Sequence, residues 1–331
     1  MGTERPGSQI MGTGAYAPER VLTNHDLARM VDTSDEWIRE RTGIRERRIA
    51  KEGENASDMA LEASRRALEA AGITAKDLDM IIVGTVTGDL PMPACAAILQ
   101  RKLGVTTIPA FDISAACAGF LYGLSIGDQF IRTGALKRVL VVGVELLSRI
   151  LNWKDRMTCV LFGDGAGAAV LGPAADDGRG ILSTRLYTDS ALVDSLCIRA
   201  GGSQEPLTVE GLAEQRDKVF MVGSDIFKIA VKNLTSASKA ALEAGGLSAN
   251  DVKWVVPHQA NMRIIMQVAL RLDIPLERFV LNIERYGNTS SASIPIALDE
   301  GIRDGRVKRG DTVLMCALGA GISWGSALIR V

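Results

Sequence analysis

Cys117 is the residue of this chain with the clearest potential for chemistry. It lies in "FDISAACAGFLYGL", between an apolar run typical of a strand and a run with helical spacing that Gly134 ends. A thiol at the start of a helix meets backbone N–H groups and the positive end of the helix dipole, which favour the thiolate. The surrounding alanines and Gly119 leave room for another group to approach. The segment predicts either a nucleophile or a small residue at a crowded corner.

Only two histidines are available to act on such a thiol. His258 follows the apolar run "VKWVVP" and precedes "QANMRIIMQVALRLD", so we expect it where a strand ends and a helix begins. Catalytic groups commonly occupy this place in α/β proteins, although a structural histidine with satisfied hydrogen bonds is the alternative. His25 lies in a polar turn that opens a helix, and we expect it to be solvated or to cap that helix.

Asn288 is the third candidate, in "ERYGNTSSASIPIAL". It precedes a helix that we expect to begin around Pro295, so it is either an N-cap or a neutral amide donor directed into a site. The glycine-rich tail "LGAGISWGSALI" can bring backbone N–H groups close to a substrate oxygen. By contrast, "LFGDGAGAAVLG" lacks the Lys-Ser/Thr of a P-loop, and we interpret its glycines as close packing of a turn and a strand.

The composition excludes several classes of protein. The chain has 331 residues, is 47% hydrophobic and carries a formal net charge of −1, which gives no general attraction to nucleic acid or to an anionic membrane. Its apolar runs are too short to span a bilayer, and residues 1–21 lack the apolar core of a signal peptide. The five cysteines are scattered without C-x-x-C spacing, so neither a disulfide framework nor a zinc site is expected. We therefore expect a cytoplasmic protein without a metal.

An internal repeat predicts the fold class. "ASRRALEAAGITAKDLDMIIVGT" and "ASKAALEAGGLSANDVKWVVPHQ" share nine of 23 aligned positions, and "RVLVVGVELLS" resembles "DTVLMCALGAG" at nearly the same offset of about half the chain. Each copy of the longer repeat predicts a helix, a glycine stop, a short acidic turn and a buried strand. We therefore expect two similar α/β halves that arose by duplication, residues 1–175 and 176–331, with sheets layered between helices.

Two local predictions concern the remaining segments. "VDTSDEWIRERTGIRER" predicts a short helix with a capping box from Thr33 to Glu36 and a stop at Gly43, which places Trp37 and Arg41 on one face. "GPAADDGRGILSTRLYTDS" and "IRAGGSQEPLTVEGLAEQRDK" are rich in glycine and polar residues, and we expect loops at the junction between the halves.

Taken in order, these motifs resemble a known family. "SAACAGF", "FGDGAGA", "VVPHQANMRII" and "YGNTSSAS" are similar to signatures of the 3-oxoacyl-[acyl-carrier-protein] synthases III, and the resemblance runs from "GTGAYAPERVLTN" to "WGSALIRV". It implies a thiolase-like fold, a homodimer, and a ping-pong condensation of an acyl-CoA primer with malonyl-acyl carrier protein that initiates fatty acid synthesis. It also implies a catalytic triad of Cys117, His258 and Asn288, with CoA thioester as substrate and no cofactor.

The resemblance assigns further roles residue by residue. The backbone N–H groups of Cys117 and of Ala320, in the turn 319–321, correspond to the oxyanion hole. Trp37, Arg41 and Arg156 match positions that bind CoA.

The resemblance also implies roles for residues on the surface and in the acyl pocket. Lys228 and Arg263 match basic positions that receive the acidic carrier protein. Leu90 belongs to a segment expected to cross the dimer interface and form the floor of the acyl pocket, where relatives that use acetyl primers often have phenylalanine. Ser224 replaces an asparagine that often lies near the pantetheine arm. These two departures leave the starter acyl group open.

Three alternatives remain at this stage. A specialised condensing enzyme or acyltransferase of secondary metabolism would keep the same triad. A cysteine-dependent thioester hydrolase would also use Cys, His and Asn, but an open cleft would be expected in place of a narrow tunnel. An inactive acyl-CoA-binding protein is disfavoured because all three triad positions are intact.

Overall fold

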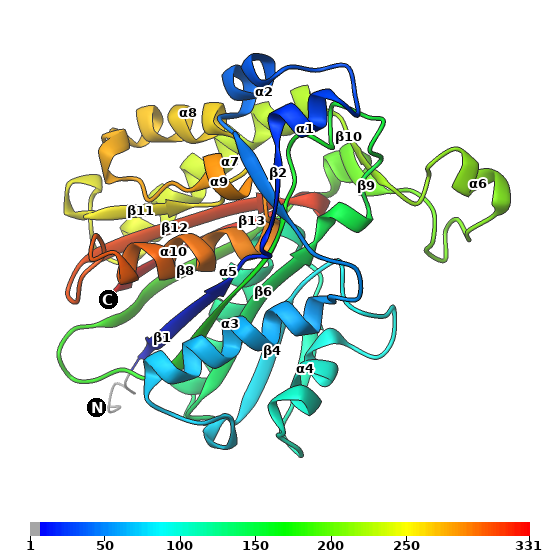
Figure 1. Ribbon diagram of the computed structural model, residues 1–331. Coiled ribbons are helices and arrows are strands. Elements are labelled where there is room, and N and C mark those ends of the chain that lie inside the picture. Colours follow the sequence, from blue (N-terminus) through cyan, green and yellow to red (C-terminus); the bar gives the residue numbers. More distant parts are fainter. Residues whose placement is uncertain (1–6) are drawn as a thin grey trace.

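The computed structural model describes residues 7–331, and it contains two main β-sheets that run through the molecule (Figure 1). Residues 1–6, part of the segment in which no signal peptide is expected, lie outside the described residues. In the first sheet β4 pairs in parallel with β5 and β6, whereas β7 runs antiparallel to its neighbours. Its order is β1 (Ser8–Tyr16), β7 (Asp164–Pro173), β6 (Val139–Leu146), β4 (Met80–Gly84) and β5 (Ala110–Ile113).

The second sheet has four strands and takes all of them from the later part of the chain. Its first pair is parallel and the other pairs are antiparallel. Its order is β11 (Trp254–Pro257), β12 (Thr312–Gly319), β13 (Ser323–Arg330) and β8 (Gly180–Thr188). The strands of the two sheets thus come from residues 8–173 and 180–330, while the domain boundary between residues 175 and 176 stays a prediction.

The repeat in the sequence corresponds to a repeat in the structure. The first copy forms α3 (Ala56–Ala71), η1 (Ala75–Asp77) and β4, and the second forms α7 (Gly223–Ala244), η5 (Ala249–Asp251) and β11. Both short turns carry a reciprocal capping box, in which the Asp77 carboxylate accepts the N–H of Thr74 and the Asp251 carboxylate accepts that of Ser248. The duplicated α/β design is therefore confirmed.

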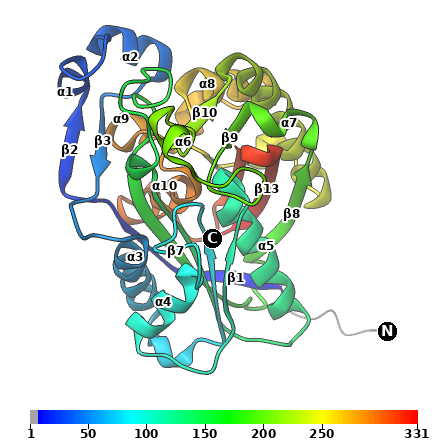
Figure 2. The same ribbon diagram turned by 90° about the vertical axis from the view of Figure 1, so that its right-hand side faces the viewer.

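Alternation along the strands explains the layers. On β12, Met315 belongs to the core between the sheets and Leu314 to the core outside them, because successive side chains of a strand point to opposite faces. One pair of helices lies between the two sheets, and a further pair covers the outer face of each sheet. Figure 2 shows the central pair between the outer helices. The central helices are α5 (Gly119–Arg132) and α10 (Ser293–Arg303); the outer ones are α3 with α4 (Cys95–Leu103), and α7 with α8 (Met262–Leu272).

Smaller elements surround the two sheets. A two-stranded ribbon with short helices lies near the start of α8, and α6 lies on an excursion that projects from the body of the molecule (Figure 1). These elements are β2 (Arg20–Thr23), α1 (Asn24–Ala28), α2 (Asp35–Thr42), β3 (Glu46–Ile49), η3 (Leu147–Arg149), η4 (Ser190–Ser195), β9 (Leu196–Ile198), α6 (Val209–Ala213), β10 (Val219–Met221), η6 (Leu276–Arg278) and α9 (Ile283–Tyr286).

Two local predictions need correction. Helix α2 starts one residue later than expected: Ser34 is the N-cap and its hydroxyl accepts the N–H of Trp37, while Gly43 ends the helix at φ +80 as predicted. The segment 172–190 was expected to be a loop, but its second half forms β8, which pairs with β13. The glycine-rich composition hid a strand whose hydrogen bonds are supplied by a distant part of the chain.

Candidate functional site

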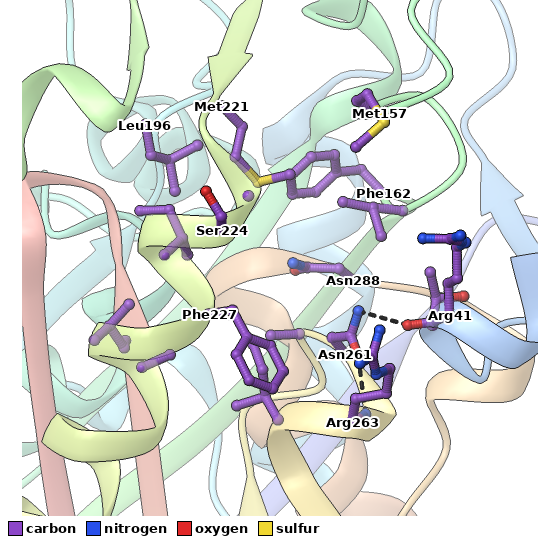
Figure 3. A pocket seen from close by; sticks show the side chains of 18 of the residues that line it. Arg41, Met157, Phe162, Leu196, Met221, Ser224, Phe227, Asn261, Arg263 and Asn288 are labelled. Carbon is purple, nitrogen blue, oxygen red and sulfur yellow. Dashed lines mark hydrogen bonds between the residues drawn. The ribbon is translucent and has the colours of Figure 1, made fainter. Parts of the chain in front are cut away.

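A cavity of about 680 Å³ lies where the two halves meet, and it brings the three predicted catalytic residues together. Cys117, His258 and Asn288 all line it, one from each of three separate strand or helix ends. Apolar side chains form most of the wall, among them those of Phe162 and Met221 (Figure 3). Such a cavity excludes water and suits an acyl chain followed by a polar group.

Cys117 lies at the corner between β5 and α5, in the short η2 turn (Ala116–Ala118). Ala116 adopts a positive φ of 44, which turns the chain sharply before the helix. The corner is held against the neighbouring strand because Gly84 approaches the backbone of Gly119: a Cβ on Gly84 would lie 2.7 Å from the carbonyl carbon of Gly119. Small residues here place Cys117, which is 8% exposed, at the base of the cavity.

His258 is buried at the end of β11 with its orientation fixed. Its backbone N–H donates to the carbonyl of Cys316 at 2.8 Å, and its Nδ1 lies 2.6 Å from Oγ of Ser293 at the start of α10. With Nδ1 engaged, Nε2 is the ring nitrogen available to the cavity. A serine partner can donate or accept, so it permits either neutral tautomer of the imidazole.

Asn288 is fixed by backbone contacts on both sides. Its N–H donates to the carbonyl of Leu161 at 2.8 Å, and its own carbonyl accepts the N–H of Gly163 at 3.0 Å. Its side-chain Oδ1 accepts the N–H of Ser290 at 2.8 Å, which leaves Nδ2 as the end of the amide that faces the cavity. The geometry supports the directed amide donor, whereas the N-cap alternative is not met, because Thr289 and Ala292 are the N-caps of η7 (Ser290–Ala292) and of α10.

Burial sets the protonation states of the site. Burial lowers the pKa of His258 to about 3, so its imidazole is neutral near pH 7. The expectation of a low-pKa thiol at Cys117 is wrong: burial raises its pKa to about 12, and the charge of Glu145 adds to the rise. A hydrogen bond from Ser290 acts in the opposite direction. Desolvation outweighs the helix start because the thiol lies deep in the cavity.

The tail of the chain packs directly against the corner of Cys117. A Cβ on Gly319 would lie 2.4 Å from the backbone nitrogen of Cys117, so only glycine allows this approach. Ala320 follows at the start of η8 (Ala320–Ile322). The two segments expected to supply the oxyanion hole are therefore adjacent, as the motif predicted.

The residues expected to bind CoA gather at the opening of the cavity. The guanidinium groups of Arg41 and Arg156 lie over the ring of Trp37, 4.8 and 5.1 Å from its centroid. All three line the cavity. The carbonyl of Arg41 also accepts the side-chain amide of Asn261 at 3.0 Å, which ties α2 to the start of α8 (Figure 3).

The two basic residues expected to receive a carrier protein flank the same opening. Lys228 on α7 and Arg263 on α8 are exposed and line the cavity, and Arg263 lies over the ring of Phe227 at 5.8 Å. Ser224 also lies on the cavity wall (Figure 3). Leu90 does not: it is 53% exposed and absent from the cavity of its own chain, so the expectation that it forms the acyl-pocket floor is not met within one chain. His25 is exposed on α1, away from the site.

Sequence reasoning missed three polar residues beside the triad. Ser293 orients His258, and Ser290 and Glu145 act on Cys117. Glu145 had a visible signal, because it is the one charged residue in the buried strand "VLVVGVEL". The two serines had none, since hydroxyl residues after Asn288 suit a helix start equally well.

Comparison with known proteins places this geometry in a family. The description 3-Oxoacyl-[acyl-carrier-protein (ACP)] synthase III matches residues 111–190, and that of its C-terminal part matches residues 242–331. Beta-ketoacyl-[acyl-carrier-protein] synthase III of Xanthomonas campestris pv. campestris is 52% identical over 331 residues, 99% of both chains. The chain belongs to the 3-oxoacyl-[acyl-carrier-protein] synthase III family. The predicted reaction class, the acyl-transferring condensation that initiates fatty acid synthesis, is thereby confirmed.

Solved structures confirm the thiolase-like fold. The synthase III of Aquifex aeolicus VF5 superposes with a TM-score of 0.90 at 47% identity and covers 98% of this chain and 100% of its own. The priming β-ketosynthase from the R1128 polyketide biosynthetic pathway superposes with a TM-score of 0.91 at 37% identity, over 100% of this chain and 98% of its own. The fold is thus shared by enzymes of primary and of polyketide metabolism.

Within residues 7–331, the His, Cys, Asp and Glu side chains form no group of three or more that is placed to hold a metal ion. Over the same residues, every helix is too short or too polar to cross a bilayer.

Proposed function

We propose that the chain transfers an acyl group from acyl-CoA to Cys117 and then condenses it with malonyl-acyl carrier protein. The observation that carries this proposal is the convergence of Cys117, His258 and Asn288 on one largely apolar cavity. The family membership supports the reaction class, and the cavity supports the assignment of the residues.

In the acylation step, Sγ of Cys117 attacks the thioester carbonyl. The S–C bond to the enzyme forms, the bond to CoA breaks, and the thiol proton passes through Nε2 of His258 to the leaving CoA sulfur. Because the thiol is neutral at rest, this transfer has to accompany the attack. The backbone N–H groups of Cys117 and Ala320 stabilise the oxyanion.

In the condensation step, the malonyl C–CO2 bond breaks and its electron pair forms an enolate. Nε2–H of His258 and Nδ2 of Asn288 donate to the enolate oxygen, since neutral donors stabilise the charge without a metal. The enolate carbon then attacks the acyl-Cys117 carbonyl, and the Cys117 thiolate leaves and takes a proton from solvent. The products are CO2 and 3-oxoacyl-acyl carrier protein. The change of His258 from acceptor to donor requires both tautomers, which Ser293 permits.

The exposed groups at the opening support the binding roles. Trp37, Arg41 and Arg156 offer a ring and two cations to the adenine and phosphates of CoA. Lys228 and Arg263 offer positive charge to an acidic carrier protein.

The exposure of Leu90 supports a role between subunits. Leu90 and Met92 are 53% and 84% exposed, as expected if this segment of one subunit of a homodimer reaches the pocket of the other. We also expect the enzyme to be cytoplasmic and to require no cofactor.

Intact-protein mass measurement tests this function. The wild type is mixed with acyl-CoAs from acetyl to decanoyl, together with isobutyryl-CoA, and compared with Cys117→Ala. A single acyl adduct on the wild type that is absent from the variant is expected. His258→Ala should slow condensation with malonyl-acyl carrier protein by about 10³-fold, and its acyl adduct on Cys117 should form more slowly than in the wild type, because the ring that takes the thiol proton is missing. No adduct with any primer, or an adduct that persists in Cys117→Ala, would contradict the proposal.

A specialised condensing enzyme is the second candidate, because the superposition on the R1128 priming enzyme is as close as that on synthases III. A panel of acceptor thioesters distinguishes the two. Carbon–carbon bond formation with malonyl-acyl carrier protein alone supports the first function, and efficient transfer to another acceptor supports the second. Release of free acid without an acceptor would instead indicate a hydrolase.

A further inference from the structure

Glu145 is a fully buried carboxyl group on β6 that the mechanism above does not use. Within the described part of the chain no Lys or Arg pairs with it; hydroxyl and backbone N–H groups satisfy it instead. Three of these donors belong to the segment after β4: Thr85 at 3.3 Å, Val86 N–H at 3.2 Å and the hydroxyl of Thr87 at 2.5 Å. A buried carboxylate without a cation is costly, so its presence calls for a reason.

The other donors to Glu145 come from the turn that faces Cys117. Ser290 and Ser291 in η7 (Ser290–Ala292) donate to its Oε1 at 3.2 and 3.4 Å. The η2 turn that carries Cys117 packs against η7, so Ser290 lies close to the sulfur, where donation from its hydroxyl lowers the pKa of Cys117 while the charge of Glu145 raises it. A hydroxyl has one proton to donate, so the carboxylate and the sulfur compete for it.

The fold itself does not require a carboxyl group at this position. In the internal repeat, Glu145 on β6 corresponds to Leu318 on β12, and that strand forms its full set of pairs with a leucine there. The acidic side chain therefore belongs to the half in which it can reach Ser290 rather than to the shared scaffold.

We propose that Glu145 is a positioning residue that controls the nucleophile through Ser290. When Glu145 is ionised, it retains the Ser290 proton and its charge opposes the Cys117 thiolate. When Glu145 is neutral, Ser290 is free to donate to Sγ and the thiolate becomes accessible. The proposal rests on the proposed function only in taking Cys117 as the nucleophile.

The environment of Glu145 allows it to change charge near neutral pH. Burial raises its pKa to about 7 against the hydrogen bonds that lower it. Of the elements packed against it, β4, residues 85–87 and η7 present no charged side chain, and η2 presents Cys117. On β7, Asp164 is held by the hydroxyl of Ser148 at 2.6 Å and the N–H of Ala50 at 2.8 Å. Cys117 is therefore the titrating group to which Glu145 is coupled.

Alkylation of Cys117 by iodoacetamide tests the coupling without any acyl substrate. Rates are followed by peptide mass against pH, with Cys117→Ala as the blank for the other four cysteines. In the wild type the logarithm of the rate should rise with pH, flatten over about one pH unit near 7, and rise again, because two coupled groups lose protons in shared steps. Glu145→Gln, which resembles the neutral acid, should give one continuous rise, with the wild-type rate at pH about 5.5 and an increase of about tenfold at pH about 8.

Two serine variants separate this role from a structural one. Ser290→Ala should shorten the flat region, because only the direct effect of the Glu145 charge remains, and should slow alkylation below pH 7 by at least about threefold, the fold-change expected for one lost hydrogen bond. Ser291→Ala is the matched control. The Ser291 hydroxyl also lies within hydrogen-bond distance of the carboxylate, at 3.4 Å, but its shorter bond, 2.6 Å, is to the carbonyl of Gly84. This substitution should change the rates by less than about twofold.

Identical pH profiles for the wild type and Glu145→Gln would overturn the proposal. If Glu145→Gln does not fold, equal profiles for Ser290→Ala and Ser291→Ala would overturn it instead. Neither result depends on acyl-CoA, whereas failure of the proposed function would appear as absence of acyl adducts on a thiol that alkylates as described here.

Discussion

The same pair of positions is occupied by two glycines in one half of the molecule and by a histidine and a serine in the other. In the first half, Gly84 ends β4 and lies against Gly119 at the start of α5. In the second, His258 follows β11 and its Nδ1 lies 2.6 Å from Oγ of Ser293, the first residue of α10. The glycines allow two backbones to touch, which fixes the corner that holds the cysteine. His258 and Ser293 instead place a titratable ring at the equivalent position of the other half.

The two corner turns extend this comparison. Both begin with a residue other than glycine at positive φ, Ala116 at 44 and Ser290 at 49, and both continue into a central helix. Their second residues are Cys117 and Ser291, and only the first lines the cavity. Duplication thus produced the same turn twice. The side chain at its second position is the nucleophile in one half and has a supporting role in the other.

Replacing the glycine at the close contact should have the largest effect on this arrangement. Gly84→Ala places a methyl group 2.7 Å from backbone atoms that cannot move independently, so we expect a loss of about 3 kcal/mol in the free energy of unfolding. Denaturant unfolding measures it. Gly202→Ala is the matched control, since nothing lies within 4 Å of a Cβ there. Equal stability of the two variants would show that the corner is looser than described.

The histidine of the polar pair should make the protein sensitive to acid. Burial lowers the pKa of His258 from 6.5 to about 3, so the unfolded chain binds a proton that the folded chain refuses. Its contribution to stability is complete above pH 6.5 and is lost as pH falls from there toward 3, by about 1.4 kcal/mol per pH unit. His258→Gln should therefore show a shallower loss of unfolding free energy between pH 6 and 4 than the wild type. Parallel curves would contradict a buried neutral imidazole.

Removing the hydroxyl group that contacts His258 should lower the rate of condensation without unfolding the protein. Ser293→Ala removes the partner of Nδ1, and we expect a fall in kcat of condensation of about tenfold, corresponding to one lost hydrogen bond of about 1.4 kcal/mol. Ser293→Thr retains the hydroxyl and should recover most of the rate. A fall in KM alone, or no difference between Ala and Thr, would contradict a role in orienting the ring.

Moving the thiol to the other corner should have no effect on acylation. In Cys117→Ala/Ser291→Cys the sulfur occupies the equivalent turn, but Ser291 is 1% exposed and lies outside the cavity. We expect no acyl adduct by intact mass, as for Cys117→Ala alone. An adduct on residue 291 would show that the two corners differ in side chain only and not in access.

Much of the fold could be predicted because its signals are local. The glycine stop at Gly72 and the capping boxes at Thr74 and Ser248 act within a few residues, and the structure contains all of them. The failures were non-local: β8 was missed because its partner β13 lies more than a hundred residues away. The role of Leu90 stays a prediction, because it depends on a second subunit rather than on the contacts of one chain.

The sequence by itself determined the duplicated α/β design and the three residues that meet in the cavity, because helix ends, buried strands and motif spacing are properties of short segments. Only the tertiary structure decided how these residues are charged. The pKa of Cys117 rises to about 12 and that of His258 falls to about 3 because both are removed from water, and the carboxyl of Glu145 lies close enough to add to the first shift. Desolvation and charge coupling depend on everything that surrounds a group, and those neighbours come from both halves of the chain.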